Sequence, residues 1–346
     1  DNISIKWVRD YLTERSQYIQ HRSKKSMTLT VITGSPQGSV ISPIFFIILI
    51  ADIDDWTTYA IISGFADDNS ATVVGDNIDE VVEKLESDAQ EILNFMASNK
   101  LLANDSKTTL MIFGKNTRDE EVSLTVGSAT IKEQKTQKLL GLEISNDMKW
   151  ENHINTLKGK LRQRLYILRH LAQFLPKAPL LQIADGIFNS QLRYGMCLFL
   201  RPRIESSDPT NGHLNSIQQM HNEMLRIVAG VHRRDKVNMN NLQKDKKVMT
   251  VNQMLCCSII SETNKILQHE TIPSLKTIFT AQGTSNMNTR SKTTRSLRPP
   301  KRRAQKTEGF STHAPKVLNK LPLEFKNSDS VTLKKKVQDW ISKNIP

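Results

Sequence analysis

The pattern of apolar and polar residues along this chain changes near residue 150. Before that point, short runs rich in Val, Ile and Thr predict strands that alternate with helices. After it, apolar residues recur every three or four positions, which predicts a series of helices. The pattern therefore predicts an α+β part, with antiparallel strands and helices, followed by a mostly helical part.

The first part of the chain predicts two helices, a strand and a hairpin. Residues 3–20 have an amphipathic pattern that predicts a helix, and "MTLTVI" predicts a strand before the turn "TGSPQG". The block 40–53 is apolar all round, so we expect a buried helix there. Next, "YAIISGF" and "NSATVVG" predict a β-hairpin with the two acids of "ADD" at its tip.

The stretch up to residue 150 predicts one long helix and several strands. A single apolar stripe predicts a helix over 78–97, with Asp76 or Asn77 as its N-cap. The runs "TLMIF" and "KLLGLEI" each predict a strand. The run "VSLTVGSATIK" predicts a second hairpin that turns at Gly127-Ser128.

From about Glu151 onward the pattern predicts helices, of which the later ones cover 178–200, 213–230 and 247–270. The first of them has an apolar stripe that consists of Ile154, Leu157, Leu161, Leu165, Leu168, Leu171 and Leu175. Its basic residues are Lys158, Lys160, Arg162, Arg164 and Arg169. We expect this helix to be apolar on one side and basic on the other.

The segment 282–308 has almost no apolar residues and carries eight basic residues between Arg290 and Lys306. Because it cannot bury a core, it is predicted to be a disordered basic linker. It is either a nuclear import signal or a solvated run of charge. Apolar periodicity returns after it and predicts a small helical tail.

The composition favours a polyanionic partner. The formal net charge is +13, and an excess of Lys and Arg at this level is typical of proteins that bind nucleic acid. An anionic membrane is the rival partner, but the longest apolar run is well short of the roughly twenty residues that a spanning helix needs. The three cysteines have no metal-binding spacing and are expected to be small core residues.

The hairpin tip carries the candidate chemistry. Two unit charges 4 Å apart repel by about 4 kcal/mol at an effective dielectric near 20, so the adjacent carboxylates of Asp67 and Asp68 need a counter-charge. Oxygen ligands at a rigid turn suit Mg²⁺, which completes its shell with water and phosphates. Two such ions would promote nucleotidyl transfer. A solvated acidic turn remains the alternative interpretation.

Upstream of the acids, "GSPQG" places an amide side chain between two glycines. Gly34 and Gly38 allow the backbone to approach another molecule closely, and Gln37 can donate and accept hydrogen bonds. Alone, this is also the pattern of an ordinary turn before a helix. Its combination with the acidic hairpin is far more specific.

The two stretches together resemble reverse transcriptases of non-LTR retrotransposons of the long interspersed, Jockey-like kind. "GSPQGSVISPIFF" is similar to the B motif of that family and "ISGFADDNSATVVG" to its C motif. "NKLLANDSKTTLMIFG" resembles the D motif, and "QKLLGLEISNDMKWENHI" resembles the primer-gripping region. "IFNSQLRYGMCLF" and "LNSIQQMHNEMLRIVAG" are similar to the helical thumb of these elements.

The resemblance implies a role for each matched residue. Asp67 and Asp68 would be the catalytic carboxylates and the ligands of Mg²⁺, with two ions in the complete enzyme, and Lys107 would face the triphosphate. Leu140 and Gly141 would belong to the primer grip. The template and nucleotide would contact Pro36, Gln37, Gly38, Ser39, Phe65 and Ala66. The nucleic-acid backbone would contact Lys158, Lys160, Arg162, Arg164 and Arg169.

The resemblance also implies a domain organisation and a set of partners. It predicts a partial right-hand polymerase palm at 1–115, a strand-rich primer-grip region at 116–150, a helical thumb at 151–230, a helical C-terminal region at 231–281, the basic linker at 282–308 and the tail at 309–346. The partners would be an RNA template, a DNA primer and deoxynucleotide triphosphates, with no membrane. Because such elements copy RNA at chromosomal DNA, the protein would act in the nucleus.

One element of the family pattern is absent from the chain. The family needs a third carboxylate, in an A motif on a strand upstream of the B motif, and no such strand precedes "GSPQG". We therefore expect a missing N-terminal part of the same polyprotein, and an inactive fragment without it. The alternatives are a repurposed remnant that only binds RNA and, less well matched because Ala66 stands where Gly is usual, a viral RNA-directed RNA polymerase.

Overall fold

The chain is α+β, as predicted, with small antiparallel sheets followed by a helical region. The computed structural model describes residues 2–114, 121–209, 211–232, 234–268, 279–281, 297–298, 309–322, 325 and 330–345. The chain divides into two compact units, 1–135 and 136–346, and each is described by itself. Among the described residues, no helix is long and apolar enough to cross a membrane.

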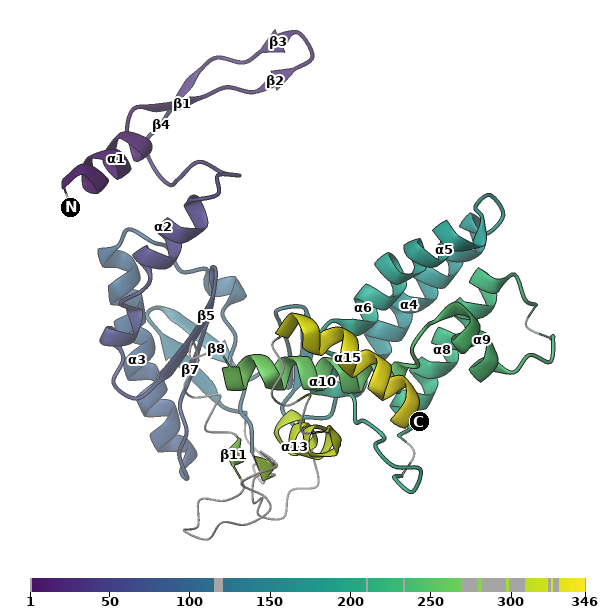
Figure 1. Cartoon of the computed structure of the whole chain (residues 1–346). Helices are drawn as coiled ribbons and strands as arrows, with labels where there is room; N and C mark the ends of the chain where they lie inside the picture. Colours follow the sequence, from purple (N-terminus) through teal and green to yellow (C-terminus); the bar gives the residue numbers. More distant parts are fainter. Residues whose placement is uncertain are drawn as a thin grey trace. The chain divides into compact units, whose positions relative to one another are not determined.

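The first unit begins with a helix and a long two-stranded arm (Figure 1). Helix α1 (Asn2–Leu12) is followed by strand β1 (Arg15–Gln17), which pairs antiparallel with β4 (Leu29–Val31). Between them, β2 (Gln20–His21) pairs with β3 (Lys24–Lys25). The prediction of a helix up to residue 20 was wrong, because the left-handed conformation of Glu14 (φ 54°) ends the helix and starts the arm.

Helix α2 (Ser42–Leu49) corresponds to the apolar block. It is shorter than the predicted 40–53, and a 3₁₀ turn (Ile53–Trp56) follows it. The prediction that this helix is buried was wrong, since none of its residues is buried and Ile44, Ile47 and Ile48 are 52%, 58% and 64% exposed. An all-apolar sequence specifies burial only where other residues cover it, and the described part of this unit does not cover α2.

The predicted acidic hairpin is confirmed. Strand β5 (Ile61–Phe65) pairs antiparallel with β6 (Asp68–Thr72), and Ala66 and Asp67 form the two-residue loop. The long helix that follows, α3 (Ile78–Ser98), also agrees with the sequence pattern. Of its two candidate N-caps, the structure selects Asn77, whose side chain accepts a hydrogen bond from the backbone N–H of Asp79 at 3.0 Å.

The remainder of the first unit contains the second predicted hairpin, β7 (Ser123–Val126) and β8 (Ala129–Lys132), with Gly127-Ser128 as its loop. The predicted strand "TLMIF" is not formed; Leu110 alone makes an isolated bridge, to Glu133. The apolar run instead provides a residue of a small core that Leu110, Leu124 and Ile131 form against α3. The apolar residues of "TLMIF" therefore indicated burial in a core and not pairing in a sheet.

The second unit begins with a hairpin where a single strand was predicted. Strand β9 (Thr136–Leu139) pairs antiparallel with β10 (Leu142–Ser145), so "KLLGLEI" reverses direction in its middle. Leu140 and Gly141 form the loop, with φ of 47° and 83°. The prediction of one continuous strand was wrong because Gly141 was taken as a strand residue and not as a turn.

A bundle of helices makes up most of the second unit (Figure 1). Its elements are α4 (Glu151–Leu171), α5 (Lys177–Ala184), a π-helical segment (Asp185–Asn189), α6 (Ser190–Arg193), α7 (Met196–Phe199), α8 (Gly212–Ala229), α9 (Met239–Lys246) and α10 (Val251–Gln268). The predicted apolar stripe of α4 is confirmed from Ile154 to Leu168, all buried. The predicted helix 178–200 is interrupted near its end by Gly195, which is left-handed (φ 65°).

Two later helices complete the core of this unit. Helices α13 (Phe310–Lys320) and α15 (Ser330–Asn344) lie in the predicted tail and pack against α10. The predicted disordered linker 282–308 lies outside the described residues, except for β12 (Leu297–Arg298), which pairs with β11 (Thr280–Ala281). The core of the second unit runs from Leu142 to Ile345 and is far larger than that of the first. Cys256 is fully buried in it, as predicted for a core cysteine.

Candidate functional site

The two predicted catalytic carboxylates lie at the tip of the β5–β6 hairpin. Phe65 and Asp68 are the last cross-strand pair, and Asp67 occupies the loop. Residues that pair directly across two strands share one face, so the exposed ring of Phe65 and the exposed Asp68 lie side by side. Four predicted site residues, 65–68, are thus gathered in one turn.

The backbone of this turn is strained. Ala66 has φ of 54°, in the left-handed region where a residue with a Cβ atom is less stable by about 1–2 kcal/mol. A strained backbone of this kind is concentrated at functional sites. Positive φ at the first residue of a two-residue hairpin loop is the geometry of a type II′ turn, in which glycine is usual at that position.

A buried acid on α3 fixes where the hairpin begins. The carboxylate of Asp88 accepts hydrogen bonds from the backbone N–H groups of Thr58 (2.9 Å), Tyr59 (2.7 Å) and Ala60 (2.5 Å). Asp88 is 1% exposed. Sequence reasoning missed this residue, although an acid within the apolar stripe of a helix, between Leu85 and Ile92, is a signal that could have found it.

The predicted template-binding turn, Pro36 to Ser39, is held by hydrogen bonds from both sides. The hydroxyl of Tyr11 on α1 donates to Ser39 Oγ at 2.5 Å, and Ser42 Oγ, in the first turn of α2, donates to the carbonyl of Pro36 at 2.7 Å. Ser39 Oγ also accepts from the backbone N–H of Ile41. The turn is therefore well defined even though Gln37 is exposed.

Further contacts hold the start of the same turn. The guanidinium of Arg15 donates to the carbonyl of Gly34. The ring of Tyr11 stacks on Trp7, with 5.6 Å between ring centroids, and lies 5.7 Å from the ring of Phe45 on α2. Gly34 and Gly38 have φ of 72° and 83°, which explains why glycine occupies both positions. Sequence reasoning assigned no role to Tyr11 or Arg15.

Lys107 lies in a short 3₁₀ turn (Asp105–Lys107) of the first unit. The carbonyl of Asn104 accepts hydrogen bonds from the backbone N–H of Lys107 (3.0 Å) and of Thr108 (3.2 Å), so the turn is closed by Asn104. The side chain of Lys107 is exposed.

The predicted primer-grip residues, Leu140 and Gly141, form the loop of the β9–β10 hairpin in the second unit. The hydroxyl of Tyr194 donates to the carbonyl of Leu140 at 2.5 Å. The base of the hairpin is fixed to α4, because His153 Nδ1 accepts from the backbone N–H of Glu143 at 3.3 Å. His153 packs against Phe199, with 4.7 Å between ring centroids, and burial lowers its pKa.

The five basic residues of α4 do not form one face. In an α-helix of about 3.6 residues per turn, Lys158, Arg162 and Arg169 lie on one flank of the buried stripe, and Lys160 and Arg164 lie on the other. Arg169 forms an ion pair with Glu223 of α8. The expectation of a helix with one apolar and one basic side thus becomes a helix with two basic flanks.

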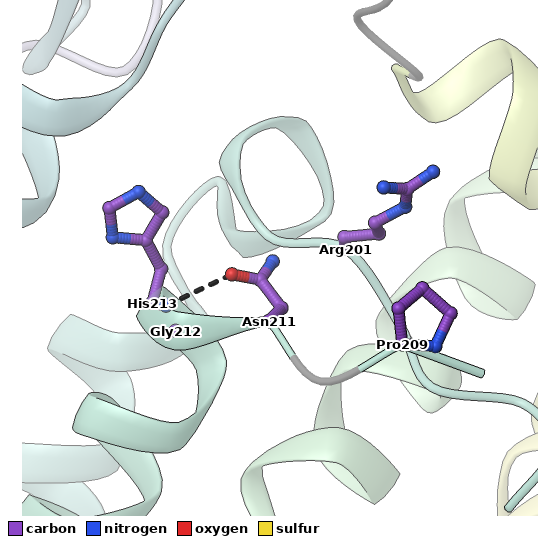
Figure 2. A pocket seen from close by; sticks show the side chains of 5 residues that line it. All are labelled: Arg201, Pro209, Asn211, Gly212 and His213. Carbon is purple, nitrogen blue, oxygen red and sulfur yellow. Dashed lines mark hydrogen bonds between the residues drawn. The ribbon is translucent and has the colours of Figure 1, made fainter. Parts of the chain in front are cut away.

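A pocket of about 400 Å³ lies in the second unit, where α8 begins (Figure 2). Its walls consist of Arg201, Pro209, Asn211, Gly212 and His213. The Asn211 side chain accepts from the backbone N–H of His213 at 2.9 Å and so caps α8. None of these five residues was predicted to be a site residue.

The two acids of the hairpin match the ligand type that Mg²⁺ prefers. Carboxylate oxygens are ligands that Mg²⁺ prefers, and it binds through one or two carboxylates together with waters and phosphates. Among the residues that the structure describes, no group of three His, Cys, Asp or Glu side chains could hold a metal ion. Asp67 and Asp68 would therefore hold such an ion only together with water and phosphate oxygens.

Comparison with known proteins agrees with this arrangement for the first part of the chain. No curated protein and no solved structure matches the chain. Residues 1–144, which contain the predicted template-binding turn, the acidic hairpin and the β9–β10 loop, match the model of the family described as reverse transcriptase (RNA-dependent DNA polymerase).

Proposed function

We propose that this chain is part of a reverse transcriptase of a non-LTR, Jockey-like retrotransposon. The family match over 1–144 and the B-like and C-like stretches within it support this assignment. An RNA template, a DNA primer and deoxynucleotide triphosphates would be its partners and substrates. Its place of action would be the nucleus, where such an element copies RNA at chromosomal DNA.

The main support for the proposal is the arrangement of residues at the tip of the β5–β6 hairpin. Two adjacent, exposed carboxylates stand on a loop whose Ala66 is held in a left-handed conformation. Since neighbouring anions repel, this arrangement suits a cation and the phosphates that it binds. Mg²⁺ would supply charge stabilisation at the transferring phosphoryl group. Asp67 and Asp68 would hold it, and the turn at Gln37 would contact the template and the nucleotide.

The exposed apolar helix α2 supports a further part of the proposal, namely that another polypeptide segment completes this unit. Helix α2 is apolar at nearly every position yet has no buried residue, whereas the stripe of α4 is buried from Ile154 to Leu168. A contiguous exposed apolar surface marks a site of contact with other protein. The same segment would supply the third carboxylate, so that the chain alone would have no polymerase activity.

Two measurements test the proposal. Mn²⁺ with a deoxynucleotide triphosphate is expected to broaden the amide NMR signals of 65–69 in the whole chain, and the double substitution Asp67→Asn, Asp68→Asn is expected to abolish this broadening. Asp54→Asn, an exposed acid of the same unit, serves as the matched control. Equal broadening in the double variant would refute the assignment of the hairpin. If the chain alone extended a primer, and Asp67→Asn abolished that extension, the proposal that the chain needs another polypeptide segment would be refuted.

The second candidate function is that of a remnant that only binds RNA. The basic flanks of α4 favour it, because they need no metal and no missing segment. Salt-dependent binding is expected under both functions. The genomic sequence that precedes the chain separates them, since an intact reading frame with an A motif favours the enzyme and stop codons favour the remnant.

A further inference from the structure

The two-stranded arm of the first unit is a narrow ribbon without a buried residue (Figure 1). Strands β1 and β4 form its base, and β2 and β3 form its outer part, where His21 pairs with Lys24. Between these two pairs of strands, the backbone N–H of Ser26 donates to the carbonyl of Ile19 at 2.9 Å. The arm is therefore held by its own backbone hydrogen bonds and not by a hydrophobic core.

The outer part of the arm carries cations that have no counter-charge. The chain contains no Asp or Glu between Glu14 and Asp52. The side chains of Arg22, Lys24 and Lys25 are exposed, and none of them forms an ion pair within the part of the chain that the structure describes. Such a cluster of cations attracts a polyanion, whose phosphates supply the negative charge that the arm lacks.

The cations lie on both faces of the ribbon. Because successive side chains of a strand point to opposite faces, Lys24 and Lys25 lie on different faces. The ammonium group of Lys25 lies 4.7 Å from the ring centroid of Tyr18. Tyr18 is the only Phe, Tyr or Trp between residues 15 and 31. The arm therefore lacks the series of aromatic rings on which the bases of single-stranded nucleic acid stack, and a duplex suits it better.

The dimensions of the arm match the major groove of duplex DNA. This groove is about 12 Å wide and about 8.5 Å deep, and it admits a two-stranded ribbon. At about 3.4 Å per residue, the stretch from Arg15 to His21 is about 20 Å long, which is enough to reach the floor of the groove. The major groove of duplex RNA is too narrow for side chains to enter. The shape of the arm therefore favours DNA over RNA.

We propose that the arm is a binding site for duplex DNA, in which β2 and β3 lie in the major groove and Arg22, Lys24 and Lys25 contact the phosphates beside it. The polymerase function proposed above does not depend on this contact, because the acidic hairpin and the turn at Gln37 belong to other elements of the first unit. With this site, the protein would hold a DNA duplex while an RNA template is bound.

Fluorescence anisotropy of labelled duplex DNA with the whole chain, measured over a range of salt concentrations, tests the site. The triple substitution Arg22→Gln, Lys24→Gln, Lys25→Gln is expected to reduce the slope of log affinity against log salt by about 3, since each lost phosphate contact reduces it by about 0.9. All three residues are exposed, so the temperature of thermal unfolding should not change.

A control variant removes the same charge from exposed lysines of the second unit. Its substitutions are Lys236→Gln, Lys244→Gln and Lys247→Gln. The slope for duplex DNA should stay close to that of the unchanged chain in this variant. Equal reductions in the two triple variants would mean that only the net charge matters, and this result would overturn the proposal.

Two further measurements test whether the arm enters the major groove. Guanine N7 lies in the major groove, so the unchanged chain should protect it from methylation by dimethyl sulfate, and the arm variant should not. Adenine N3 lies in the minor groove, and its methylation should be the same with both proteins. The arm variant should bind duplex RNA with the affinity of the unchanged chain.

The outcomes separate the proposal from its rivals. A smaller salt slope on DNA and lost protection of guanine N7, with unchanged binding of duplex RNA, support the proposal. An equal loss of affinity for both duplexes would show phosphate contact without entry into a groove and would overturn it. Arm-dependent binding to phosphatidylserine vesicles, with DNA binding that does not depend on the arm, would assign the arm to an anionic membrane instead. Failure of the unchanged chain to bind duplex DNA would overturn the proposal and leave the polymerase function standing.

Discussion

The buried carboxylate of Asp88 accepts a hydrogen bond from the backbone N–H of Tyr59 at 2.7 Å, so the middle of α3 determines where β5 begins. Asp88→Asn replaces one acceptor oxygen by an amide nitrogen and leaves backbone donors without a partner. We expect the free energy of unfolding of the first unit to fall by about 2 kcal/mol. Urea unfolding followed by tryptophan fluorescence measures this, since Trp56 packs against Phe95 on α3. The exposed Glu83→Gln on the same helix should change little, and equal effects of the two substitutions would contradict the role of Asp88.

The hydrogen bond from Tyr11 to Ser39 is expected to keep the Gly34–Ser39 turn closed. Tyr11→Phe and Ser39→Ala should each speed amide hydrogen exchange in this turn by several-fold, corresponding to about 1 kcal/mol. The double variant should show no more than the larger single effect, because both substitutions remove the same bond. Additive effects in this double-mutant cycle would show that the two residues act separately.

The stability of the second unit should decrease in mild acid because of His221. This residue is fully buried between Phe188 and its neighbours, and burial lowers its pKa to about 4, with Arg193 acting in the same direction and Asp185 against it. An unfolded histidine titrates near 6.5, so the unfolded state binds more protons between the two values. Stability is therefore full above about pH 6.5 and is lost as the pH falls toward 4, by up to about 3 kcal/mol.

Substitution of His221 tests whether this residue causes the predicted loss of stability at low pH. In His221→Phe, the free energy of unfolding between pH 7 and pH 5 should depend less on pH, with a residual slope from His153, whose pKa burial also lowers. His170→Gln, at an exposed histidine of α4, should keep the full pH dependence. A pH dependence in His221→Phe as steep as in the unchanged chain would exclude His221 as its source.

The exposed face of α2 should bind apolar dyes. Ile47→Lys with Ile48→Lys is expected to reduce the fluorescence of bound 8-anilinonaphthalene-1-sulfonate and the tendency to aggregate, with a change in unfolding free energy within about 0.5 kcal/mol. A large loss of stability would instead mean that these isoleucines are covered in solution. Ile131→Lys, in the small core of this unit, provides the contrasting case of a buried residue.

Arg162 and Arg169, on the same flank of α4, should differ in their effect on the salt dependence of RNA binding. Arg162→Gln is expected to lower the slope of log affinity against log salt by about 1, as the loss of one phosphate contact does. Arg169→Gln should lower it less, because Glu223 already neutralises that guanidinium. Equal slopes for the two variants would contradict this distinction.

Local sequence patterns predicted the elements that carry their own signal. The acidic hairpin, the hairpin at Gly127-Ser128 and the apolar stripe of α4 from Ile154 to Leu168 follow from alternation, turn chemistry and helical period, and these were predicted correctly. The predicted roles of the site residues, by contrast, remain predictions, because they depend on bound nucleic acid and metal.

The errors arose where a local pattern has two possible outcomes. The block that became α2 has a sequence that specifies burial, but burial depends on what covers the helix. The pattern of "KLLGLEI" predicts a strand. In the structure its central residue, Gly141, has positive φ and forms a turn. The supporting residues Asp88, Tyr11 and Tyr194 act through contacts with backbone far away in the sequence, which no local pattern contains.

The arrangement of α10 and α15 has a consequence for synthesis on the ribosome. The two helices pack together, and Gln253 Nε2 donates to the carbonyl of Ile345 at 3.1 Å. Helix α10 therefore emerges from the exit tunnel long before the segment that shields its apolar side. The nascent unit must wait for α15, and a product that ends before α15 would expose the side of α10 that α15 covers to chaperones and proteases.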